Sequence, residues 1–149
     1  MGNQSATALL IAVALLLPAC SDDKAAVPAG CRQGPDAVRA ALRDAPGPVT
    51  VDGSSLSECI KDTSGGGELQ EIGITYLDVA SGLADDAVKE PNGDEALQLG
   101  YLMGAFERSK VGAQGVGYEL GRRLDSELLR VGSRSPAFRR GERAGRSGG

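Results

Sequence analysis

Few side chains in this chain can carry chemistry, and their types limit which chemistry is possible. The 149 residues include 20 carboxylates, three cysteines and three tyrosines, but no histidine. Without histidine, the commonest general base and the commonest metal ligand are both missing. An enzyme or small-ligand carrier would have to use tyrosines and carboxylates in a cleft between helices. The tyrosines available for that alternative are Tyr76, Tyr101 and Tyr118.

Two further patterns could bind ions, and neither has the spacing of a known site. Acidic residues gather around one expected helix–helix turn, where oxygen ligands could suit Ca²⁺, but their spacing does not match an EF-hand loop. Gly65–Gly67 precede a helix and could cradle an anion, but the Gly-Lys-Ser/Thr of a P-loop is missing. We therefore expect no metal, cofactor or catalytic site. The acidic residues are Asp85, Asp86, Glu90, Asp94 and Glu95.

An apolar run near the N-terminus predicts an export signal. Residues 8–17 form a ten-residue apolar segment, whereas a membrane-spanning helix needs about 20 residues. A short apolar run at this position is typical of a signal peptide. The run leads into Leu17-Pro18-Ala19-Cys20, which resembles the lipobox of bacterial lipoproteins.

The resemblance implies both a processing step and a location. In bacterial lipoproteins the cysteine of the lipobox carries a diacylglycerol, and cleavage before it removes the leader. It implies that residues 1–19 are a signal peptide and that Cys20 is the lipidated N-terminus. The protein would then be anchored to a membrane on its extracytoplasmic face. The alternative is an ordinary cleaved signal, with its best site at Val27-Pro28-Ala29 and no lipid on Cys20.

With Cys20 assigned to lipid, Cys31 and Cys59 remain as a pair. Outside the cytoplasm such a pair predicts a disulfide. Closing this loop of 29 residues would contribute about 3.5 kcal/mol in the chain-entropy model. A metal site is the weaker alternative, because two thiols without histidine or a Cys-x-x-Cys spacing make a poor ligand set.

The charge is distributed unevenly along the chain. Residues 20–131 carry 11 basic and 19 acidic side chains, whereas residues 132–149 carry five basic and one acidic. An acidic body would repel phosphate over most of its surface, so we expect no nucleic-acid partner. We expect residues 132–149 to be a disordered basic tail. Its arginines could contact anionic lipid headgroups or acidic wall polymers; they are Arg134, Arg139, Arg140, Arg143 and Arg146.

Apolar periodicity predicts one helical domain over residues 31–131, with residues 20–30 as a flexible tether. A first helix is expected to begin at Pro35, and a second, short one is expected to follow a capping box formed by Ser55 and Glu58. Three more helices are expected over residues 68–89, over residues 96–106 and from Val116 to Val131. Residues 49–51 are expected to be extended. The segment 96–106 is apolar on nearly every side and should be the central helix.

The resulting expectation is a mainly α protein, a small antiparallel bundle of four or five helices. Small residues four positions apart, such as Gly100 and Gly104, should let helix axes approach closely. With no catalytic motif and a predicted anchor, we expect a binding or structural adaptor in the cell envelope. Its partner would be an envelope protein or an anionic polymer.

Overall fold

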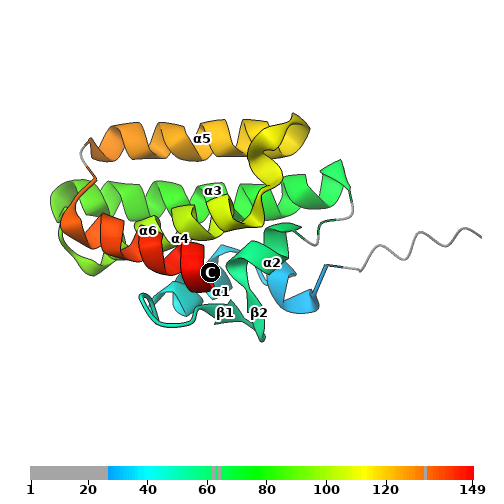
Figure 1. Cartoon of the computed structure of the whole chain (residues 1–149), viewed down its shortest axis with the longest axis horizontal. Helices are drawn as coiled ribbons and strands as arrows, with labels where there is room; N and C mark the ends of the chain where they lie inside the picture. Colours follow the sequence, from blue (N-terminus) through cyan, green and yellow to red (C-terminus); the bar gives the residue numbers. More distant parts are fainter. Residues whose placement is uncertain (1–26, 62, 64, 133) are drawn as a thin grey trace, which may run out of the picture.

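A computed structural model of the chain describes residues 27–61, 63, 65–132 and 134–149, and within them the fold is mainly helical, as expected (Figure 1). The residues predicted to form the signal peptide, Cys20 and most of the predicted tether lie outside the described residues. The described elements, in which η marks a short 3₁₀-helix, are η1 (Ala29–Arg32), α1 (Pro35–Leu42), β1 (Thr50–Val51), β2 (Ser54–Ser55), α2 (Leu56–Lys61), α3 (Gly66–Lys89), α4 (Asp94–Ser109), η2 (Val111–Ala113), α5 (Gly115–Val131) and α6 (Pro136–Gly148).

A small β-hairpin and the disulfide organise the N-terminal part. The expected extended segment forms β1, which pairs antiparallel with β2. The turn between them is Asp52-Gly53, and both residues have positive φ, as a tight two-residue hairpin turn requires. The predicted capping box is confirmed, since the Ser55 amide donates to the Glu58 carboxylate at 2.9 Å.

The predicted disulfide is present in the structure. Cys31 in η1 and Cys59 in α2 are bonded, with their Cα atoms 5.3 Å apart, and both residues are buried. The bond fastens the segment that leads into α1 to helix α2, both of which lie at the same end of the molecule (Figure 1). It therefore joins the beginning of the domain to its core.

Helices α3 and α4 form the expected antiparallel pair, joined by a short turn (Figure 1). The apolar stripe that runs along α3 at steps of three or four residues is buried at every position except Leu69, which is partly buried; the other members are Ile72, Tyr76, Val79, Leu83 and Ala87. Between Ala96 and Phe106 every residue of α4 is buried except Gln98, which is partly exposed. As predicted, α4 is the central helix, and it packs against α2, α3 and α6.

Helix α5 lies on the outside of α3 (Figure 1). Only Gly117, Leu120 and Leu124 of α5 are fully buried. Gly73 of α3 lies under Leu120, and farther along the same two helices Asp85 pairs with Arg130. Because positions on both helices increase together, α3 and α5 run parallel.

The prediction of a disordered tail at residues 132–149 is wrong over most of its length. Residues 136–148 form helix α6, and Ser135 caps it by accepting a hydrogen bond from the Phe138 amide at 3.1 Å. Phe138 is almost fully buried, and one face of the helix lies against α4. The described residues thus contain six α-helices rather than the four or five expected, because the basic segment supplies one more.

Candidate functional site

Helices α4 and α6 meet along two rows of glycine. A methyl group at Gly141 would overlap the carbonyl oxygen of Leu97 and lie 2.9 Å from the backbone nitrogen of Tyr101. Equivalent overlaps would occur at the other three positions, so no side chain other than hydrogen fits between the helices. The four glycines are Gly100 and Gly104 on α4 and Gly141 and Gly145 on α6.

The register of these contacts shows that α4 and α6 run parallel. Gly100 faces the backbone of Phe138, and Gly104 faces the backbone of Glu142 one turn later. The close approach expected from the small residues of α4 is therefore confirmed, and its partner is the C-terminal segment. The helix that carries the basic residues is consequently fixed against the centre of the bundle.

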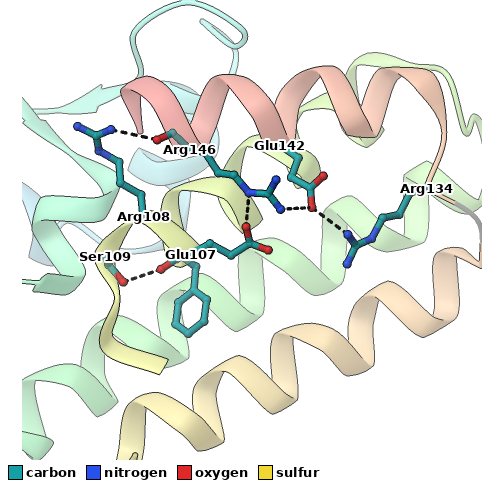
Figure 2. A network of polar contacts seen from close by, with 7 residues as sticks. Glu107, Arg108, Ser109, Arg134, Glu142 and Arg146 are labelled. Atoms are coloured by element: carbon teal, nitrogen blue, oxygen red, sulfur yellow. Dashed lines mark hydrogen bonds and ion pairs between the residues drawn. The ribbon is translucent and has the colours of Figure 1, made fainter. Parts of the chain in front are cut away.

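An ion-pair network holds α6 in position from one side (Figure 2). Glu142 is buried, at 6% exposure, and accepts hydrogen bonds from Arg134 at 3.0 Å and from Arg146 at 3.1 Å. Arg146 also pairs with Glu107 of α4, and this hydrogen bond raises the pKa of the Arg146 guanidinium. The Arg134 guanidinium lies 5.7 Å from the centre of the Phe138 ring, within cation–π range.

Arg108 extends this network to the C-terminal end of α6. Its guanidinium donates to the carbonyl oxygen of Arg146 at 3.0 Å (Figure 2) and to that of Ser147 at 2.9 Å. Carbonyl groups at a helix C-terminus carry partial negative charge and favour a cation there. The neighbouring Ser109 hydroxyl donates to the carbonyl oxygen of Phe106 at 2.6 Å (Figure 2).

The other three arginines of the basic segment remain available at the surface. Arg139, Arg140 and Arg143 are exposed, and they form no ion pair within the part of the chain that the structure describes. Glu142 is the sole acidic residue after position 131, and it is buried. The exposed side of α6 is therefore purely cationic; we call these three arginines the basic face of α6.

A polar pocket of about 420 Å³ lies close to the C-terminal end of α6. Three cations line it, namely Lys61, Arg108 and Lys110, together with one carboxylate, Glu58, and three serines. The backbone hydrogen bond from Ser55 lowers the pKa of the Glu58 carboxyl below its usual value. This pocket places positive charge near the C-terminal end of α6.

An apolar groove of about 450 Å³ separates part of α5 from α3. Its apolar lining includes Leu69, Ile74, Leu77, Val116 and Leu120. Ile74 is 63% exposed, so the groove is open to solvent along one side. Among the described residues that line the groove, Glu119 is the only carboxylate, and it is paired with two arginines.

The three tyrosines considered for catalysis do not converge on a cleft. The Tyr76 hydroxyl is buried and donates to the carbonyl oxygen of Leu56 at 2.9 Å; burial raises its pKa. The Tyr101 hydroxyl is also buried and accepts a hydrogen bond from the Val49 amide at 3.2 Å. Tyr118 is 58% exposed. Two of the three hydroxyls thus form hydrogen bonds to the backbone inside the core, and the third tyrosine lies at the surface.

The acidic residues at the end of α3 are used in surface ion pairs. Asp86 pairs with Lys89 at 2.8 Å, and Asp85 pairs with Arg130. Over the described ranges, no group of three or more metal-binding side chains comes together. None of the helices in these ranges is both long and apolar enough to cross a membrane.

Sequence reasoning missed α6 although a signal for it was present. Gly141, Gly145 and Gly149 are spaced four apart, like the glycines of α4, and Ser135-Pro136 is a favourable start for a helix. Gly149 is buried, and its carbonyl oxygen accepts a hydrogen bond from the Ser57 hydroxyl.

Comparison of the chain with protein-family models, with curated proteins and with solved structures gave no match.

Proposed function

We propose that this protein is a lipid-anchored, extracytoplasmic lipoprotein that acts as a binding or structural adaptor in the cell envelope. In this proposal residues 1–19 are a signal peptide, and the Cys20 thiol carries the lipid. Each buried acyl CH₂ group adds about 0.8 kcal/mol of membrane affinity, so two or three chains hold the protein firmly. The folded domain then stays beside the bilayer.

The observation that carries the proposal is the use of the three cysteines. Cys31 and Cys59 are bonded to each other, as is usual for proteins outside the cytoplasm. The remaining cysteine is Cys20, at the end of the segment that resembles a lipobox. A disulfide in the domain and a lipidation motif before it support the same compartment.

The adaptor role is supported by what the described surface offers. Tyr76 and Tyr101 are engaged with backbone groups in the core, so the alternative of a tyrosine-based enzyme or carrier gains no support from their placement. The basic face of α6 and the groove between α3 and α5 are instead suited to contacts with larger partners.

The anchor is tested by cysteine substitutions in the full chain. We expect Cys20→Ala to abolish incorporation of labelled palmitate and to leave an unprocessed or soluble protein. The control is the double variant C31A/C59A, which removes the other two cysteines but should still be labelled and found in the membrane fraction. Unchanged labelling and fractionation of the Cys20→Ala protein would refute the lipid anchor.

The adaptor role requires a separate experiment. Crosslinking of the tethered protein in cells, followed by mass spectrometry, should recover a defined envelope protein or polymer. If the purified domain instead turns over a specific small molecule, and a single carboxylate substitution abolishes that turnover, the adaptor role is wrong.

A further inference from the structure

We propose that the basic face of α6, formed by Arg139, Arg140 and Arg143, docks onto an anionic bilayer by binding the phosphate groups of lipid headgroups. The inference deepens the proposed function, because it rests on the anchor for the place where docking occurs. The contact chemistry is independent of the anchor and can be measured without it.

The three arginines are held ready for such a contact on a fixed helix. Positions 139, 140 and 143 lie within about one turn of each other. Helix α6 cannot shift easily, because glycine backbones meet on its inner side and the Glu142 network fixes its flank. A guanidinium group can donate two parallel hydrogen bonds to the oxygens of one phosphate. Among the residues that the structure describes, these three arginines have no ion-pair partner.

The composition of the face favours a layer of phosphates over a protein partner. Phe138 is the only large apolar side chain of α6, and it is 1% exposed. Protein interfaces usually have an apolar or aromatic centre surrounded by polar residues. The exposed side of α6 has no such centre, whereas binding to headgroups needs only positive charge near the surface.

The distance from the predicted anchor favours a bilayer over a soluble anion. Seven residue steps separate Cys20 from Val27, the first described residue, so the domain can move at most about 25 Å from the lipid. The rest of the domain is acidic and would be repelled by an anionic surface. These two effects together turn the basic face toward the bilayer.

Sedimentation with vesicles tests the inference on the chain from residue 20 with Cys20→Ser, which contains every buried residue described above. The vesicles are either phosphatidylcholine alone or an equal mixture with phosphatidylglycerol. We expect binding to the anionic vesicles only, and its loss at high salt, where screening is strong. The triple variant R139Q/R140Q/R143Q should bind about a hundredfold more weakly, at about fivefold per arginine.

A second triple variant, K89Q/R122Q/R123Q, is the matched control. It lowers the net charge by the same three units on α3 and α5, at side chains that are 62–74% exposed. It should keep most of the binding, and circular dichroism should show that both variants remain folded.

Three results would overturn the inference: equal loss in both triple variants, equal binding to the neutral vesicles, or binding to soluble polyphosphate but not to vesicles. Because the tested chain has no lipid, failure here leaves the Cys20 experiment unaffected. Failure of that experiment likewise leaves the vesicle result standing.

Discussion

Gly141 is the position where the contact between α4 and α6 can be tested most directly. In a Gly141→Ala protein the new methyl group would overlap the carbonyl oxygen of Leu97. That oxygen belongs to a helix backbone, which cannot rotate aside as a side chain can. The two helices would have to move apart, and contacts on both sides of the substitution would loosen.

The size of the effect follows from two opposing contributions. Overpacking of a tight interior costs about 1–3 kcal/mol, and a clash with backbone places Gly141→Ala near the upper end. Alanine is the better helix former by up to about 1 kcal/mol. We therefore expect the free energy of unfolding to fall by about 2 kcal/mol, and the melting temperature by about 8 °C.

Gly148→Ala in the same helix provides the control. The nearest atom to its new methyl group would be the Tyr101 hydroxyl oxygen, at 3.9 Å, so there is no clash. The gain in helix propensity has the same sign for both substitutions and largely cancels in their difference. That difference, about 3 kcal/mol, isolates the contact between the two backbones.

The measurement is urea unfolding followed by far-ultraviolet circular dichroism, on the chain from residue 20 with Cys20→Ser as the reference. Gly148→Ala should have the midpoint of the reference or a slightly higher one, and Gly141→Ala a clearly lower one. If the two alanine proteins unfold at the same urea concentration, the conclusion that α4 and α6 meet backbone to backbone is refuted.

Further predictions concern the disulfide, an exposed carboxylate and a buried hydroxyl. Replacing Cys31 and Cys59 together by alanine should destabilise the domain by about 3.5 kcal/mol in urea unfolding, because the open loop regains chain entropy; an unchanged midpoint would contradict this. Two arginines one turn away lower the pKa of Glu119 to about 2, below its ordinary 4.5. The stabilisation from this cluster should therefore be present above pH 4.5 and be lost as the pH falls toward 2. A carboxyl titration followed by nuclear magnetic resonance would disprove the lowered pKa if its midpoint lay near 4.5. Tyr76→Phe should cost about 1 kcal/mol in thermal unfolding, since it removes a buried hydrogen bond between the Tyr76 hydroxyl and the carbonyl oxygen of Leu56; a cost near zero would argue against this hydrogen bond.

The sequence allowed accurate prediction where burial depends on large apolar side chains or on local hydrogen bonds. The α3 stripe around Ile72 and Val79 follows the helical period, so its buried side could be predicted. The capping box at Ser55 and Glu58 depends on a spacing of three residues. These signals are local in the sequence and need no knowledge of the rest of the fold.

Helix α6 could not be predicted in the same way, because its buried face has only one large apolar side chain, Phe138, and otherwise consists of small residues and Glu142. Glycine adds little to apolar periodicity and is a poor helix former, so composition alone favours disorder for the segment. The close contact with α4 offsets this low helix propensity. It can be recognised only when the glycines of both segments are considered together. In folded proteins most of the stability of a helix comes from tertiary packing, which can outweigh such local preferences.

The residues of the candidate site could be predicted from the sequence, but which of them are ion-paired and which remain available could not. The five arginines of the C-terminal segment could be identified as a group from the sequence. Which of them remain available depends on where Glu107 and Glu142 lie in space. Arg134 and Arg146 are engaged by these carboxylates, and that separation leaves the basic face of α6 as the surface for docking.

The parallel arrangement of α4 and α6 also affects the order in which the chain can fold. The glycine face of α4 is covered by a helix that is synthesised more than 25 residues later. The disulfide and helices α1–α3 can assemble first, since domains generally begin to fold from the N-terminal side during synthesis. Packing of the centre is completed only when α6 arrives, so a chain interrupted before residue 136 would keep its central helix exposed to proteases and chaperones.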